Sequence, residues 1–177
     1  MKEDQRVRLS RQLLRSALIV LLKEKNINKI SVREICDAAE INRTTFYKHY
    51  GNPYDLLEDI ENSLLEELSS KICLGSKNCM AQILKIIDQK TEVYRLLANN
   101  NVDPLFPQKL LNLPAVRESL SNITAQRESG DYGGYVYEFL TWGGYSVIRR
   151  WLNKEKRESP EEMAKYIQKL FGHIENM

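Results

Sequence analysis

Residues 30–50 read ISVREICDAAEINRTTFYKHY, and their spacing predicts two short helices joined by a turn. Ser31 begins a Ser-x-x-Glu capping box that Glu34 closes, which satisfies two free amide groups at a helix start. After a three-residue interruption, Asn42 is a suitable cap for the second helix. Two short helices joined in this way form a helix-turn-helix.

The second helix, predicted over residues 43–50, carries a polar face that a globular core does not need. Only Phe46 and Tyr50, four residues apart, are expected to face inward. The other side chains are hydrogen-bond donors suited to phosphate oxygens and base edges, whereas Glu and Lys are the usual residues of a solvated helix surface. A connector with no ligand is the alternative interpretation of the spacing. The donors are Arg43, Thr44, Thr45, Tyr47, Lys48 and His49.

Charge is distributed unevenly along a chain whose net charge is only +2. Residues 1–50 contain 11 Lys and Arg against 6 Asp and Glu, whereas residues 51–177 contain 15 against 18. A basic amino-terminal third favours an acidic partner, of which nucleic acid is the obvious example. A chance distribution is the alternative.

Composition indicates a globular, helical protein of 177 residues. Hydrophobic residues make up 42% of the chain, and only eight Gly and five Pro are present, which favours long helices over an all-β architecture. Cys36, Cys73 and Cys79 match neither a disulfide framework nor a paired zinc-ligand pattern, which indicates a reducing compartment. The densest apolar stretch, residues 17–22, is too short to span a bilayer. We therefore expect a cytoplasmic protein without a membrane segment, metal or cofactor.

Apolar periodicity predicts further helices on both sides of the helix-turn-helix. Ser159-Pro160-Glu161-Glu162 forms a second capping box with Pro at the first helical position. The last two helices carry more apolar surface than a single small helical body needs, so a partner surface is expected. The predicted helical ranges are 9–25, 54–72, 83–98, 105–123 and 132–152, with a last helix after Ser159.

The stretch from Ile30 to Tyr50, followed by Leu56-Leu57, resembles the amino-terminal domain of the TetR/AcrR transcriptional regulators. The most specific part of the resemblance is Thr45-Phe46-Tyr47-x-His49-Tyr50. It implies an all-α, TetR-like fold of about nine helices. A three-helix DNA-binding domain with a helix-turn-helix would cover residues 7–67, with its motif at 31–50. A helical ligand-binding and dimerisation domain would cover residues 68–177.

Two positions depart from the family pattern. The family usually has a small residue, most often Gly, where Glu40 stands, so the turn is expected to hold a non-Gly residue in the left-handed conformation at a cost of about 1 kcal/mol. Many members also place a phosphate-binding Lys at the start of the fourth helix, where this chain has Asn52-Pro53-Tyr54. Lys48 and Tyr54 are the candidates to replace that contact.

The resemblance implies roles for particular residues. Arg33, Arg43 and Thr44 would contact base edges, and Thr45 either a base or a phosphate. The last two helices would pair two subunits, so that the dimer contacts a pseudo-palindromic operator in double-stranded DNA. Phosphate contacts are assigned to Ser31, Tyr47, Lys48 and His49, and Asn42 completes the predicted DNA-binding set.

A small-molecule pocket is the second implication of the resemblance. Tyr94, Phe106 and Trp142 are our candidates to line it, and such walls would suit an apolar or aromatic effector. The alternative is that these aromatic side chains belong to the core. The segment from Trp151-Leu152 to Glu162 is similar to a carboxy-terminal type found in several small regulators of this family, some of them linked to dihydroxyacetone metabolism.

Catalysis is the weakest reading of the sequence, because neither His49 nor His173 has a partner at metal or triad spacing. Three binding functions remain open. The first is a dimeric repressor released from DNA by a small molecule. The second is a DNA-binding architectural or cell-division factor of the same fold without an effector, and the third is a helical protein-interaction module.

Overall fold

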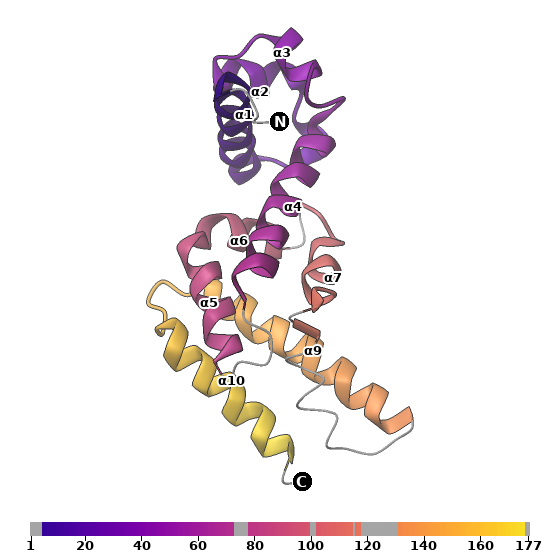
Figure 1. Cartoon of the computed structure of the whole chain (residues 1–177), viewed down its shortest axis with the longest axis vertical. Helices are drawn as coiled ribbons and strands as arrows, with labels where there is room; N and C mark the ends of the chain where they lie inside the picture. Colours follow the sequence, from indigo (N-terminus) through magenta and orange to yellow (C-terminus); the bar gives the residue numbers. More distant parts are fainter. Residues whose placement is uncertain (1–4, 73–77, 100–101, 115, 118–130, 176–177) are drawn as a thin grey trace. The chain divides into compact units, whose positions relative to one another are not determined.

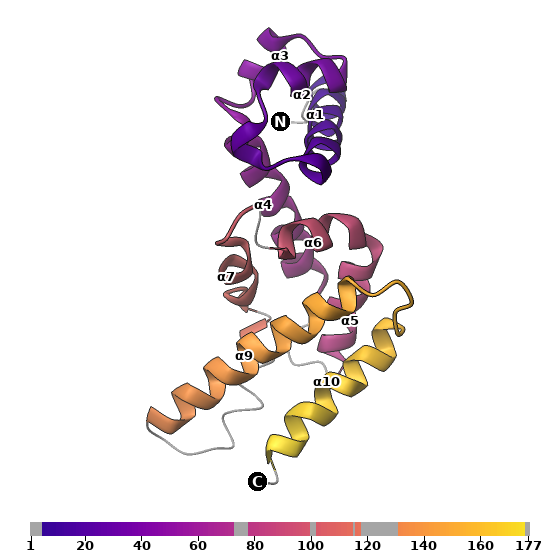
Figure 2. The same ribbon diagram turned by 180° about the vertical axis from the view of Figure 1, so that it is seen from behind.

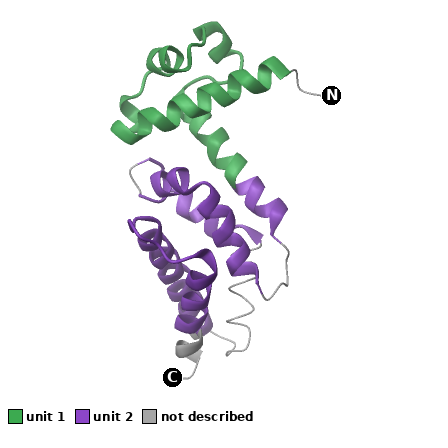
Figure 3. Ribbon diagram, turned by 90° about the vertical axis from the view of Figure 1, so that its left-hand side faces the viewer, with its two compact units in different colours: residues 1–64 green, residues 65–177 purple. Residues whose placement is uncertain are grey.

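The computed structural model of the chain describes residues 5–72, 78–99, 102–114, 116–117 and 131–175. Within these ranges the chain forms nine α-helices and no strand, which confirms the all-α prediction (Figures 1 and 2). Two compact units divide the chain, residues 1–64 and residues 65–177 (Figure 3). Cys73 and the second half of the helical segment predicted over 105–123 lie outside the described residues.

Unit 1 buries one side of each of its helices. On the first helix Leu14 and Leu18 are fully buried, whereas Leu13 is exposed. The helices are α1 (Gln5–Glu24), α2 (Val32–Ala39), α3 (Arg43–Tyr47) and the first part of α4 (Pro53–Lys71), with a 3₁₀ turn, η1 (Ile27–Lys29), after α1.

Side-chain caps begin α2 and α4, and the cap of α2 is the one that the sequence predicts. The Ser31 hydroxyl accepts a hydrogen bond from the Glu34 amide at 3.3 Å, and Glu34 accepts one from the Ser31 amide at 2.9 Å. Asn52 Oδ1 accepts hydrogen bonds from the amides of Tyr54 and Asp55 and so caps α4. These bonds use amides that have no partner within the helix.

The turn between α2 and α3 contains the backbone conformation expected at Glu40. This residue has φ 55° and ψ 38° and is the one non-Gly residue with positive φ in the described part of the chain. Its amide donates to the Asp37 carbonyl and so ends α2. A side chain at such a position is strained, because Cβ approaches the backbone.

Glu40→Gly should therefore stabilise unit 1 by about 0.5–1 kcal/mol, the relief of strain being partly offset by the greater freedom of Gly in the unfolded chain. Chemical denaturation of the full chain measures this change. Glu40→Ala is the matched control, because it removes the carboxylate and keeps Cβ. Equal stability of the Gly and Ala variants would show that the turn is not strained.

Unit 2 contains the second part of α4 and the remaining helices. The long helix predicted over 83–98 is wrong in one respect, because it is two helices broken at Lys90, whose φ of −127° is not helical. The Thr91 hydroxyl donates to the Asp88 carbonyl at 2.8 Å, a local bond that competes with continuous helix. The helices are α5 (Cys79–Gln89), α6 (Thr91–Ala98), α7 (Phe106–Leu111), α9 (Asp131–Leu152) and α10 (Pro160–Glu175).

The connection from α9 to α10 is fixed against the junction of α5 and α6. Arg157 bonds the Thr91 hydroxyl and pairs with Asp88 at 2.9 Å, and its guanidinium lies 5.0 Å from the centre of the Trp151 ring. The second capping box is confirmed, with the Glu162 amide donating to the Ser159 hydroxyl at 3.2 Å. The capping box predicted at Ser159 therefore marks the start of α10 correctly.

Candidate functional site

The side chains of α3 divide into an anchored side and an exposed side. Phe46 is fully buried, and Tyr50 is buried three residues after the helix ends, as the four-residue spacing predicts. The two rings lie 5.6 Å apart between centroids, and Tyr47 meets Phe46 edge to face. This aromatic packing fixes α3 to the core of unit 1 and leaves its opposite side free.

Most of the predicted contact residues lie on that opposite side. The exposed residues are Arg43, Thr44, Tyr47 and Lys48, whereas Thr45 and His49 are half-buried. The helix is shorter than the predicted 43–50, since α3 ends at Tyr47. Residues 48–50 continue as a turn, with the amides of His49 and Tyr50 both donating to the Phe46 carbonyl at 2.9 Å.

Three further predicted residues have structural bonds of their own. Asn42 Oδ1 caps α3 by accepting from the Thr44 amide at 2.8 Å. The Ser31 hydroxyl is held by Glu34 in the capping box. Arg33 pairs with Asp37 at 3.5 Å, but both side chains are exposed, and a pair of this kind contributes at most about 1 kcal/mol. Arg33 can therefore exchange this partner for an external anion.

Glu34 is also held by Lys25, which links the end of α1 to the start of α2. The hydrogen bond from Lys25, together with those from Ser31, lowers the pKa of Glu34 to about 2. Glu34 thus stays ionised at neutral pH and keeps the helix-turn-helix attached to α1.

A cluster of polar side chains behind α3 joins three segments of unit 1. Asp59 on α4 accepts hydrogen bonds from Tyr50 at 2.6 Å and from Arg11 and Arg15 on α1 at 2.7 Å each. Burial would raise the pKa of Asp59, but the bonds from Arg15 and Tyr50 and the two positive charges lower it to about 2. The cluster fixes the end of the α3 turn to α4. Sequence reasoning missed it, because its members lie up to 48 residues apart.

Asp59→Asn should destabilise unit 1 by about 1–2 kcal/mol at pH 7, because it removes the charge that the two arginines and Tyr50 share. A group whose pKa is lowered on folding stabilises the protein above its unfolded pKa, here 3.8. Denaturation at several pH values should show a constant difference from the parent above about pH 5, shrinking as pH falls towards 2. A difference that did not change with pH would contradict this role for the carboxylate.

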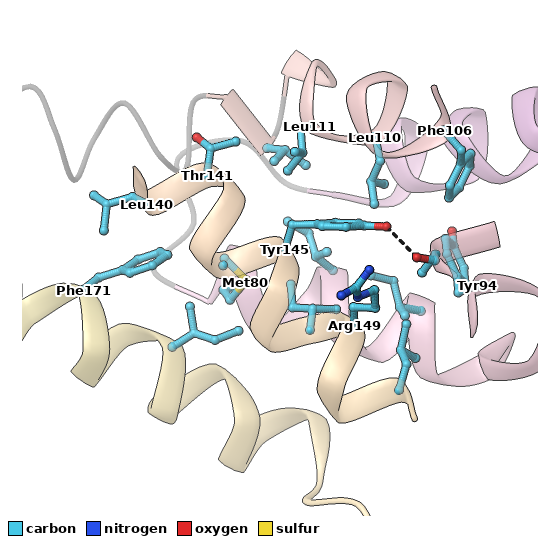
Figure 4. A pocket seen from close by; sticks show the side chains of 18 residues that line it. Met80, Tyr94, Phe106, Leu110, Leu111, Leu140, Thr141, Tyr145, Arg149 and Phe171 are labelled. Carbon is cyan, nitrogen blue, oxygen red and sulfur yellow. Dashed lines mark hydrogen bonds between the residues drawn. The ribbon is translucent and has the colours of Figure 1, made fainter. Parts of the chain in front are cut away.

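A cavity of about 60 Å³ lies within unit 2, between α5, α6, α7, α9 and α10 (Figure 4). Two of the three predicted pocket residues, Tyr94 and Phe106, line it. Trp142 does not. It is 42% exposed and lies about 100° around α9 from Thr141, which does line the cavity. Tyr145 occupies the position expected for Trp142, and the two rings meet edge to face with centroids 6.0 Å apart.

Two stripes of large apolar side chains are exposed on the last two helices. The α9 stripe consists of Tyr135, Phe139 and Trp142, at the i, i+4, i+7 spacing of one helix face. The α10 stripe consists of Tyr166 and Leu170, four residues apart. Helices α9 and α10 contact each other. Exposed apolar surface of this kind is typical of a protein–protein contact.

Only part of the apolar surface of α9 faces the core. Leu140 and Trp151 are buried, whereas Tyr135 and Phe139 are more than 65% exposed. On α10, Ile167 and Phe171 are buried within unit 2 and are therefore not part of the exposed α10 stripe.

Two negative findings concern the described residues only. No helix there is long and apolar enough to cross a membrane. In the same part of the chain, no three side chains of His, Cys, Asp or Glu gather as a metal site. The side chain of His173 lies outside the described residues.

Two family models match the chain. The model described as bacterial regulatory proteins, tetR family, matches residues 14–60, which include α2 and α3. The model described as transcriptional regulator C-terminal region matches residues 76–173, more than half of the chain.

Individual relatives agree with these matches. An HTH-type transcriptional regulator of Bacillus subtilis (strain 168), YxbF, is 23% identical over 173 residues; the match covers 89% of this chain and 43% of YxbF, so the chain spans less than half the length of that relative. A TetR transcriptional regulator from Streptococcus agalactiae 2603V has a similar fold, with a TM-score of 0.73 at 20% identity over 95% of this chain and 96% of that chain. The dihydroxyacetone kinase operon activator DhaS is similar at a TM-score of 0.63 and 19% identity, over 92% and 93% of the two chains.

Proposed function

Because the chain belongs to the TetR family of transcriptional regulators, we propose that it acts as a dimeric repressor that a small molecule releases from a palindromic operator. The observation that carries the proposal is the division of α3, where buried Phe46 and Tyr50 hold an exposed set of donors outward. Residues 7–67 are assigned to DNA binding and residues 68–177 to effector binding and dimerisation. Since its target is DNA, we assign the protein to the cytoplasm.

The proposed DNA contacts follow the exposure of the side chains. Arg43 and Thr44, at the first turn of α3, are assigned to base edges together with Arg33. Tyr47, Lys48 and His49 are assigned to phosphates, and Thr45 to either kind of contact. Asn42 can keep its capping bond and contact DNA through its amide nitrogen. The Ser31 hydroxyl donates its proton to Glu34 at 2.8 Å, so Ser31 would have to turn that proton to a phosphate oxygen to contact DNA.

Salt dependence tests the phosphate contacts as a group. If each subunit neutralises about four phosphates, log K for the operator should fall with log salt at a slope near −7. Fluorescence anisotropy with labelled operator at about 50 to 300 mM salt measures this slope. A slope near zero would rule out the proposed interface.

Dimerisation is assigned to the α9 and α10 stripes. Two-fold pairing of these helices would bury apolar side chains that are exposed in the single chain, as expected for an obligate interface. A two-fold dimer presents two α3 helices, and such dimers bind half-sites about one helical turn apart in successive major grooves. The operator is therefore proposed to be pseudo-palindromic.

Release by an effector is assigned to the unit 2 cavity. A ligand shifts operator affinity only by its preference for one conformation, and a hundredfold preference corresponds to about 2.7 kcal/mol of coupling. Helix α4 starts in unit 1 and ends in unit 2, so it is the proposed route of that coupling. The test is a metabolite screen for compounds that bind the chain and release it from selected operator DNA.

The second candidate function is a DNA-binding architectural factor of the same fold without an effector. The small volume of the cavity favours it, since about 60 Å³ holds only about four to six water molecules. If no compound that binds unit 2 changes operator affinity, this second function replaces the first.

A further inference from the structure

The walls of the unit 2 cavity are almost wholly apolar, and three of their polar side chains lie towards one end; the fourth, Thr141, lies near Leu140 and donates to the Tyr137 carbonyl at 2.6 Å. Leu140 and Phe171 lie at one end, and Tyr94, Tyr145 and Arg149 lie towards the other (Figure 4). Tyr145 donates a hydrogen bond to the Ala98 carbonyl at 3.0 Å, so its proton is already used. The other two groups remain to be explained.

The Tyr94 hydroxyl is a buried donor without a partner. The side chain is 2% exposed, and its oxygen has no hydrogen bond within the described structure. Burial, with the negative charge of Glu67, raises the pKa of Tyr94, so the hydroxyl keeps its proton at neutral pH. A buried hydroxyl left without a partner costs about 1–3 kcal/mol, which a bound acceptor would recover.

Arg149 supplies a positive charge to the same end of the cavity. Among the described residues it has no acidic partner within ion-pair distance. Arg149 itself lines the cavity. Burial raises the pKa of Tyr145 there, and the positive charge of Arg149 partly offsets that rise. Arg149 lies near the end of α9 but is not needed to cap that helix, because Arg95 Nε donates to the Leu152 carbonyl at 2.7 Å.

From these observations we infer that the cavity binds a small apolar monocarboxylate, whose carboxylate pairs with Arg149 and accepts a hydrogen bond from Tyr94. A planar guanidinium matches a carboxylate in two parallel hydrogen bonds, and one positive charge neutralises one negative charge. A short aliphatic body would occupy the apolar end, as the volume of about 60 Å³ requires. The inference rests on the proposed function only in treating this cavity as the effector site.

Calorimetric titration of the full chain with matched acids and amides tests the inference. Propionate and butyrate, small enough for a cavity of about 60 Å³, carry the carboxylate, and propionamide and butyramide replace it by a neutral group of the same shape. The acids should bind at least about tenfold more tightly than their amides, because only the acids pair with Arg149. Amides that bind as well as the acids would overturn the inference. So would the absence of binding by both acids at about 10 mM, the highest ligand concentration of the titration.

Variants separate the pairing from general effects on the fold. Arg149→Gln should weaken the acids about tenfold or more and leave the amides unchanged, and Tyr94→Phe should weaken the acids several-fold. Arg150→Gln is the matched control, because Arg150 is the exposed neighbour on the same helix, and it should bind the acids as the parent does. Thermal melts without ligand check that each variant is folded. Unchanged binding of the acids by Arg149→Gln would overturn the assignment.

The same ligands in an operator gel-shift assay separate this inference from the proposed function. Acids that bind through Arg149 without releasing DNA support the inference and contradict the proposed release. Release by neutral compounds alone, with no acid bound, supports release and overturns the inference.

Discussion

Replacing Phe139 and Leu170 together by Asp should convert the protein to monomers and reduce operator affinity at least about a hundredfold. The two side chains are among the most exposed apolar residues of the α9 and α10 stripes. If these stripes meet across a two-fold axis, the double variant buries four unpaired carboxylates, which costs several kcal/mol. A monomer binds one half-site and loses the gain in affinity that comes from linking two. Analytical ultracentrifugation, which distinguishes the 20.6 kDa chain from its dimer, measures the first effect.

Gln168→Asp is the matched control for this experiment. Gln168 is exposed on α10 but lies about 160–200° around the helix from the residues of the α10 stripe. It should leave both dimerisation and DNA binding unchanged. Ile167→Asp is unsuitable as a test, because Ile167 is 1% exposed within unit 2 and its replacement would unfold that unit. A Phe139→Asp, Leu170→Asp variant that remained dimeric and bound the palindrome would place the interface elsewhere.

Arg43→Ala should cost about 1–3 kcal/mol of operator affinity and relax the preference at one base position in each half-site. Arg43 is exposed at the first position of α3 and is fixed by a helix that Phe46 anchors. Lys48→Ala is the comparison, because a phosphate contact contributes to every sequence alike. It should weaken selected and scrambled DNA equally and lower the salt slope by about 1 per subunit. Binding titrations with operator variants, each changed at one base pair, measure both effects.

Identical base preferences for Arg43→Ala and the parent chain would contradict the base contact. Relaxed preference in Lys48→Ala would show that the two roles are assigned the wrong way round. Among the described residues neither side chain makes a hydrogen bond or ion pair that holds the fold, so circular dichroism should be unchanged in both variants.

Local patterns made the helix-turn-helix predictable from the sequence. Its caps, at Ser31 with Glu34 and at Asn42, depend on residues two or three positions apart, so their spacing alone is informative. The left-handed Glu40 was expected because a turn of this length, compared with the family, needs a residue in that conformation. The same local reasoning located the start of α10.

Other features depend on contacts that no local pattern reports. Helix α9 is apolar on several sides, so periodicity could not decide which side faces the core. Tyr135 and Phe139 are exposed, and Trp142 lies outside the cavity of Tyr94 and Phe106, beside a second pocket. The cluster at Asp59 joins residues from three separate segments. In the sequence, each of them alone is indistinguishable from an ordinary surface charge or an inward-facing tyrosine. The sequence did not indicate Arg149 as a ligand-binding residue for the same reason, because only the folded structure places it at the wall of the cavity.

Recognition of a palindromic operator is tested by selecting binding sites from random double-stranded DNA with the full chain and footprinting the selected sequence. We expect enrichment of one two-fold symmetric site, with protection in two successive major grooves and loss of protection in the Phe139→Asp, Leu170→Asp variant. Enrichment of no sequence, or equal binding of selected and scrambled DNA at physiological salt, would contradict it.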